Sequence, residues 1–106
     1  MDLISKKCTP CEGNIQPLSV EEVTQNLRLL KDWQYTDNNT IKKSFKFVSF
    51  LHTMSFVNKV AEIAEAEDHH PDLYISYGLC QIEIWTHAIK GLSENDFILA
   101  SKIDAL

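Results

Sequence analysis

The spacing of apolar residues along the chain predicts three amphipathic helices. Apolar side chains recur every three or four positions in segments 19–30, 49–67 and 93–105, which is the repeat of one helix face. Ser19 with Glu22, and Ser93 with Asp96, form capping-box patterns at the starts of the first and third segments. Pro71 disfavours a helical conformation in the residue before it, so the second helix is expected to end near His69 and His70.

Between these helices the pattern changes to the two-residue alternation of strands. Segments 33–36 and 41–47 flank a turn at Asp37–Asn39, and segments 73–77 and 80–87 flank Gly78, so each pair reads as a hairpin. Consecutive hairpins favour antiparallel neighbours. The sequence therefore predicts an α+β fold in the order α-β-β-α-β-β-α, with one four-stranded antiparallel sheet and helices packed on one face.

Length and composition indicate one globular domain. The 106 residues suit a single domain, assigned to residues 19–106, preceded by an arm over residues 1–18 that lacks periodicity. The formal charge of −5 and the lack of a Lys/Arg-rich run argue against binding to nucleic acid or an anionic membrane. With no long apolar run and no apolar leader at the N-terminus, we expect a cytoplasmic protein.

Three histidines are the main candidates for chemistry. His69 and His70 lie at the end of the second helix and His87 lies at the end of the fourth strand, two ends that can meet when helices stack on one sheet. Glu65 lies four residues before His69 and Asp68 adjoins the pair, and a carboxylate beside an imidazole holds its orientation. Such rings can give and take protons near pH 7. Helix-dipole complementation and a three-histidine zinc site are the alternatives.

These residues carry a resemblance to a known family, pterin-4a-carbinolamine dehydratase. The matching pattern is Glu65-Ala66-Glu67-Asp68-His69-His70-Pro71, then Tyr77, Thr86-His87, Gly91-Leu92-Ser93-Glu94 and Asp96. The resemblance extends more loosely over residues 19–105. It implies a hydro-lyase that removes water from a 4a-hydroxytetrahydropterin to give quinonoid dihydropterin, so that an aromatic amino acid hydroxylase can reuse its cofactor. Neither a metal nor a redox cofactor is implied.

The resemblance also implies roles for individual residues. His69, His70 and His87 are the catalytic candidates, with the assignment of acid and base left open. At the substrate-binding site, Glu65 and Asp68 are expected to orient the rings. Thr86 and Ala88 are expected to border the pterin, and Asp96 is expected to act as a helix cap or as part of the site. A homodimer or homotetramer is implied as well. The alternative function is a non-enzymatic interaction or assembly protein of the same fold.

Some positions depart from the family pattern or fall outside it. Leu73 stands where an aromatic residue is common, Ala88 replaces an acidic residue, and Trp85 replaces a smaller one. Trp85 could form a new wall of the pocket, a subunit contact or packing on the sheet surface, and the last two are favoured. Cys8 and Cys11 form a CxxC pattern without a second pair, for which a flexible arm with reduced thiols is favoured over a redox pair or half of a zinc site.

Overall fold

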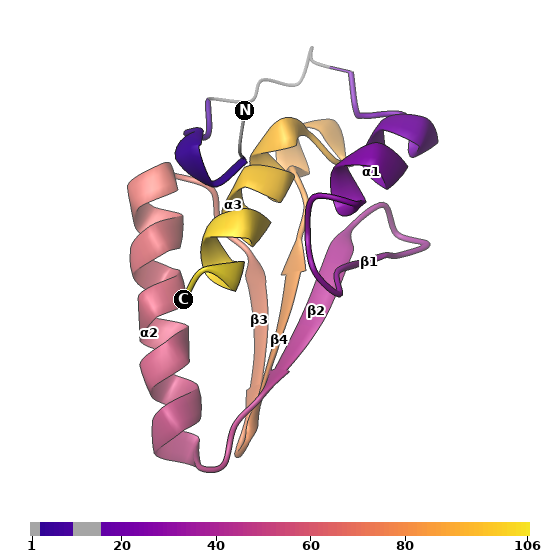
Figure 1. The fold of residues 1–106 in the computed structure, drawn as a ribbon. Coiled ribbons are helices and arrows are strands. Elements are labelled where there is room, and N and C mark those ends of the chain that lie inside the picture. Colours follow the sequence, from indigo (N-terminus) through magenta and orange to yellow (C-terminus); the bar gives the residue numbers. More distant parts are fainter. Residues whose placement is uncertain (1–2, 10–15) are drawn as a thin grey trace.

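A computed structural model describes residues 3–9 and 16–106 of the chain (Figure 1). Its helices and strands follow the predicted order, with two additional short 3₁₀ helices. The elements are η1 (Leu3–Ser5), α1 (Val20–Leu27), β1 (Gln34–Tyr35), β2 (Ile41–Lys46), α2 (Phe50–Glu67), β3 (Asp72–Ser76), β4 (Leu79–Ile84), η2 (His87–Ile89) and α3 (Glu94–Asp104).

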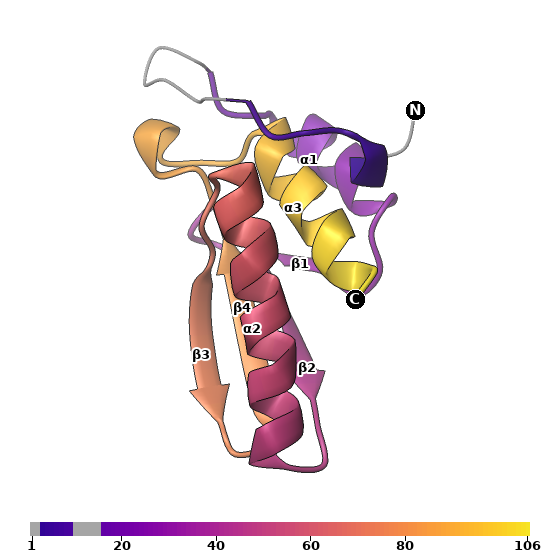
Figure 2. The same ribbon diagram turned by 90° about the vertical axis from the view of Figure 1, so that its left-hand side faces the viewer.

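The four strands form one antiparallel sheet in the order β1-β2-β4-β3. Helices α2 and α3 lie next to each other on one face of this sheet (Figure 2). The predicted α+β architecture is therefore confirmed. The sheet order makes β3 an edge strand, and it brings the end of β4 close to the end of α2.

The core lies between the sheet and the helices, and capping residues fix where the helices begin. Ser19 and Ser93 form the predicted capping boxes, and Ser49 caps α2 by accepting a hydrogen bond from the backbone N–H of His52. Strand and helix residues then bury their apolar faces together. The fully buried side chains include Val23, Ile41, Val60, Ile82, Ile84, Phe97, Ile98, Leu99 and Ile103.

The structure differs from the sequence prediction at three element boundaries. Helix α1 ends at Leu27 instead of residue 30, and β1 contains only two residues. Strand β4 ends at Ile84, and His87 lies in η2 instead of in the strand. Thr86 pairs with Gly91 in an isolated bridge, so the chain folds back at the position where the alternating pattern suggested a continuing strand.

The described part of the N-terminal arm packs against the domain. Leu3 is 6% exposed and joins the core, and the Lys102 side chain donates a hydrogen bond to the Ile4 carbonyl oxygen at 3.0 Å. The free arm favoured for the two cysteines is therefore not found at Cys8, which is half-buried. Cys11 lies outside the described residues.

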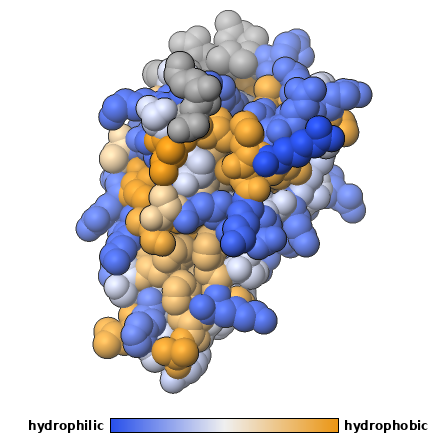
Figure 3. All heavy atoms as spheres, in the orientation of Figure 1, coloured by the Kyte–Doolittle hydropathy of each residue, from blue (hydrophilic) through white to orange (hydrophobic). Residues whose placement is uncertain are grey.

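The surface away from this arm carries several exposed apolar side chains. Val48 and Leu51, around the start of α2, are 84% and 78% exposed. The β2–α2 turn lies beside the β3–β4 turn, and Figure 3 shows apolar side chains at the lower end of the molecule. Within the described residues, no helix combines the length and the apolar character required to cross a membrane.

Candidate functional site

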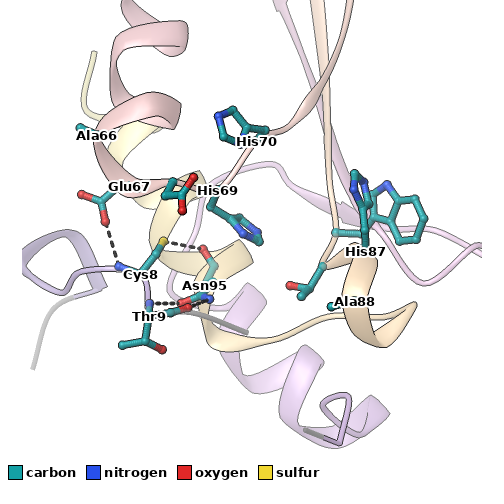
Figure 4. A pocket seen from close by; sticks show the side chains of 12 residues that line it. Cys8, Thr9, Ala66, Glu67, His69, His70, His87, Ala88 and Asn95 are labelled. Atoms are coloured by element: carbon teal, nitrogen blue, oxygen red, sulfur yellow. Dashed lines mark hydrogen bonds between the residues drawn. The ribbon is translucent and has the colours of Figure 1, made fainter. Parts of the chain in front are cut away.

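A pocket of about 600 Å³ lies where the end of α2, the β4–η2 corner, the start of α3 and the arm meet (Figure 4). The three predicted histidines all line it. His69 and His70 come from the link between α2 and β3, and His87 faces them from η2. The lining consists of Cys8, Thr9, Ala66, Glu67, Asp68, His69, His70, Trp85, Thr86, His87, Ala88 and Asn95.

Asp68 explains how two consecutive histidines reach this pocket. It ends α2 in the left-handed conformation, with φ 52° and ψ 42°, while its backbone N–H still bonds to the Ala64 and Glu65 carbonyl oxygens. A left-handed residue at a helix end turns the chain away from the helix axis. His69 and His70 therefore leave the helical path, and Pro71 follows them into β3.

His69 is held by the buried carboxylate of Asp96. The His69 Nε2 atom lies 2.6 Å from Asp96 Oδ1, and the Asp96 side chain is fully buried. The other oxygen, Oδ2, accepts hydrogen bonds from the Thr86 hydroxyl and from the Ser93 backbone N–H, both at 2.8 Å. A carboxylate can only accept, so Nε2 of His69 carries the hydrogen. No described residue forms a hydrogen bond with Nδ1 of His69.

The other two histidines are exposed, and each ring contacts a different neighbouring side chain. The Nε2 atom of His70 forms a short hydrogen bond with Glu65, whose side chain is 77% exposed. The His87 ring stands edge-on to the Trp85 ring, with 4.2 Å between the centroids. The Trp85 indole N–H in turn donates to Asp72 Oδ2 at 3.2 Å, which fixes the orientation of the ring beside His87.

The predicted substrate-binding residues fall into two groups. Asp68, Thr86 and Ala88 line the pocket, while Glu65 and Asp96 are outside the lining formed by the described residues. The expectation that Glu65 would neighbour His69 is wrong, because the turn at Asp68 breaks the helical spacing and Glu65 pairs with His70. The sequence left open whether Asp96 is a helix cap or part of the site. In the structure it caps α3 and also forms a hydrogen bond with His69.

Several lining residues were missed by the sequence interpretation. For Trp85 a pocket wall was the less favoured of three alternatives, and Trp85 does line the pocket, beside His87. Cys8 stood out in the CxxC pattern and Glu67 in the histidine motif, but the sequence did not place them, Thr9 or Asn95 in the pocket, because their contacts join the arm to helices far away in the sequence. Only the density of polar residues around Ser93–Asp96 could have suggested Asn95.

Burial and hydrogen bonding set the charge states on the arm side of the pocket. The Cys8 backbone N–H donates to Glu67 Oε1 at 2.8 Å, and this bond is the main reason why the pKa of Glu67 is lowered. Partial burial, together with the Glu67 charge, raises the pKa of the Cys8 thiol to about 12. Cys8 is therefore a protonated thiol at neutral pH. Among the described side chains, no three His, Cys, Asp or Glu residues are grouped to hold a metal ion.

The fold and the pocket together define an α+β protein in which three imidazoles line one pocket. Residues 16–106 match the family model described as "Pterin 4 alpha carbinolamine dehydratase". The chain belongs to this family, which confirms the resemblance seen in its histidine pattern.

Relatives cover almost the whole chain. A protein of Nitrosospira multiformis named "Putative pterin-4-alpha-carbinolamine dehydratase" is 56% identical over 105 residues, which are 99% of this chain and 92% of that protein. A protein of the same name from Halorhodospira halophila is 49% identical over 107 residues, covering 100% of this chain and 98% of its own.

Two solved structures share the fold. A transcriptional coactivator/pterin dehydratase from Brucella melitensis has a TM-score of 0.81 and 34% identity, with 85% of this chain and 97% of that chain covered. A pterin dehydratase-like protein identified as a RuBisCO assembly factor has a TM-score of 0.62, with 71% and 88% covered. Its identity of 22% shows a shared fold only.

Proposed function

We propose that this protein catalyses the dehydration of a 4a-hydroxytetrahydropterin to the quinonoid dihydropterin. The observation that carries the proposal is that His69, His70 and His87, which come from two different parts of the chain, line one pocket (Figure 4). Membership of the pterin carbinolamine dehydratase family supports the substrate class. Coupling to an aromatic amino acid hydroxylase, which would supply the substrate, is part of the same proposal.

The reaction needs one acid and one base on a single substrate. A general acid protonates the hydroxyl group on the ring carbon, and the C–O bond breaks to release water. A general base removes the proton from the neighbouring ring nitrogen, whose electron pair forms the new C=N bond. Two imidazoles can perform both transfers, and no electrons are exchanged with another molecule. Acid–base assistance of this kind contributes about 10²–10⁴-fold in rate.

The surroundings of each ring support an assignment of roles. His69 suits the base, because its bond to Asp96 fixes the hydrogen on Nε2 and leaves Nδ1 as the proton acceptor. His70 and His87 are the candidates for the acid. Both are exposed, so solvent can return a proton to either ring between turnovers. Thr86 acts mainly through Asp96, since its buried hydroxyl donates to that carboxylate.

The experiment that tests this function follows pterin absorbance while an aromatic amino acid hydroxylase generates the carbinolamine. The wild-type protein is expected to accelerate dehydration, and His69→Ala and His87→Ala are expected to lose most of that acceleration, about 10²-fold or more. His52→Ala is the matched control. His52 lies in the first turn of α2, about 25 Å along the helix from the pocket, and bonds to Ser49.

The outcomes separate the two functions. Full activity in His52→Ala with loss in the pocket variants supports the enzyme. If the folded wild-type protein leaves the spontaneous rate of dehydration unchanged, the enzymatic proposal fails and an interaction or assembly role takes its place.

A homodimer or homotetramer is the assembly that we propose. Edge strand β3 exposes Tyr74 and Ile75, whose exposed fractions are 64% and 37%. An unprotected edge with apolar side chains readily pairs with another strand. This supports association of copies through the sheet.

A further inference from the structure

The short segment Cys8–Thr9 forms one side of the pocket, although it lies outside the residues matched by the family model. The arm that carries it contacts the core and α3. Leu3 is buried in the core, and Lys6 forms an ion pair with Glu94 of α3 at 2.8 Å. In Figures 1 and 2 this segment crosses the ends of α2 and α3.

Asn95 binds the backbone of Thr9 at both ends of its side-chain amide. Its Oδ1 atom accepts from the Thr9 N–H at 2.9 Å, and its Nδ2 atom donates to the Thr9 carbonyl oxygen at 2.6 Å. Asn95 is only 6% exposed, so its amide has little access to water. A buried amide that loses such partners carries a desolvation penalty, which favours the docked arm.

Glu67 provides a second attachment next to the first. Its side chain is 7% exposed, it accepts from the Cys8 N–H at 2.8 Å, and it lies 3.6 Å from Lys102 Nζ. The Cys8 thiol also donates weakly to the Asn95 carbonyl oxygen at 3.5 Å. Two buried polar groups of the helices therefore depend on this segment. Figure 4 shows Cys8, Thr9 and Asn95 together, across the pocket from His87 and Ala88.

We propose that Cys8 and Thr9, held by Asn95, are a positioning element that closes the substrate pocket and sets its affinity for the pterin. They take no part in proton transfer, because a protonated thiol and backbone groups are poor acids and bases near neutral pH. Undocking the segment should open one side of the pocket to water and weaken substrate binding. It should leave the chemistry of the bound substrate unchanged. The inference rests on the proposed dehydratase function.

The test compares Asn95→Ala with wild type in the full-length protein. The steady-state dehydratase assay is expected to give KM raised about tenfold, the equivalent of losing roughly one to two hydrogen bonds, with kcat unchanged. Alkylation of Cys8, located by peptide mass spectrometry, is expected to become faster as the segment undocks. Thr9→Pro removes the N–H that donates to Asn95 Oδ1, and it also fixes φ at position 9 and restricts the backbone of Cys8. It leaves α3 unaltered, so it serves as the second variant if Asn95→Ala does not fold.

Glu94→Gln is the matched control. It breaks the ion pair between Lys6 of the same arm and Glu94, the α3 residue next to Asn95. Glu94 is outside the pocket lining, and exposed ion pairs contribute little to stability. KM and Cys8 alkylation are expected to stay at wild-type values.

Faster alkylation of Cys8 with an unchanged KM would overturn the inference, because the segment would then have undocked without weakening substrate binding. Unchanged alkylation in both Asn95→Ala and Thr9→Pro would overturn the role of Asn95. A fall in kcat alone would contradict a positioning role. An inactive wild-type protein would instead be a failure of the proposed function.

Discussion

The buried carboxylate of Asp96 offers the sharpest test of how proton positions are set in the pocket. It receives three hydrogen bonds, from His69 at Oδ1 and from Thr86 and Ser93 at Oδ2. Asp96→Asn keeps the size of the side chain but offers one accepting oxygen and one donating nitrogen. If the oxygen stays with Thr86 and Ser93, the nitrogen faces His69 Nε2. His69 must then accept at Nε2 and carry its hydrogen on Nδ1.

The structure gives different magnitudes for stability and for activity. Asp96→Asn retains the α3 cap and loses one charge-assisted bond, so we expect the free energy of unfolding to fall by about 1–3 kcal/mol. Asp96→Ala removes all three bonds and leaves buried donors without partners, for a loss of roughly 3–5 kcal/mol. Dehydratase activity should fall by about 10²-fold or more in Asp96→Asn, because Nδ1 can no longer accept a proton.

Urea unfolding followed by tryptophan fluorescence measures the free energy of unfolding. Pterin absorbance in the coupled assay measures the dehydratase activity. Combining Asp96→Asn with His69→Ala should reduce activity no further than His69→Ala alone, because the two residues act as one unit. Undiminished activity in a stably folded Asp96→Asn variant would refute this reasoning. Asp96 would then serve only as the cap of α3.

Two further predictions concern the thiol and the assembly. With a pKa of about 12 in place of 9.0, Cys8 should react with iodoacetamide at pH 8 roughly a thousandfold more slowly than an unfolded-chain cysteine, because only the thiolate reacts. The rate should rise with pH well beyond 9, and a plateau near pH 9 would contradict burial of the thiol. Light scattering should give a dimer or tetramer mass, and a monomer mass at micromolar protein would count against pairing through β3.

Local signals in the sequence were sufficient to predict most of the fold. Ser19 and Ser93 act within one helical turn, and Pro71 acts on the residue before it, so these boundaries depend on neighbouring residues alone. The turn between β1 and β2 is local as well, with Asn39 in the left-handed region at φ 62°. Such features can be read from the sequence because they need no knowledge of distant contacts.

The site was harder to predict because distant contacts decide its details. Alternation suggested that β4 continues to His87. The buried Thr86 hydroxyl instead bonds to Asp96 and Ser93, and the chain turns into η2. The helical spacing suggested that Glu65 pairs with His69. The left-handed turn at Asp68 takes His69 off the helix, and His69 forms its hydrogen bond with Asp96 instead.

The contacts of the N-terminal arm were even harder to predict from the sequence. Cys8 meets Glu67, and Thr9 meets Asn95, across separations of 59 and 86 residues. Neither contact has a periodic pattern or a spacing that could be recognised in the sequence. The histidine pattern was recognisable because its spacing is itself the feature that defines the resemblance.

The most direct test of the central claim is a titration with a non-reactive dihydropterin, followed by NMR of the histidine ring nitrogens. If the three imidazoles surround one substrate, the signals of His69, His70 and His87 should shift together and saturate at the same ligand concentration. His52, in the first turn of α2, should not move. A ligand that saturates while the His87 signal stays unchanged, or that shifts His52 as strongly as the others, would contradict the account.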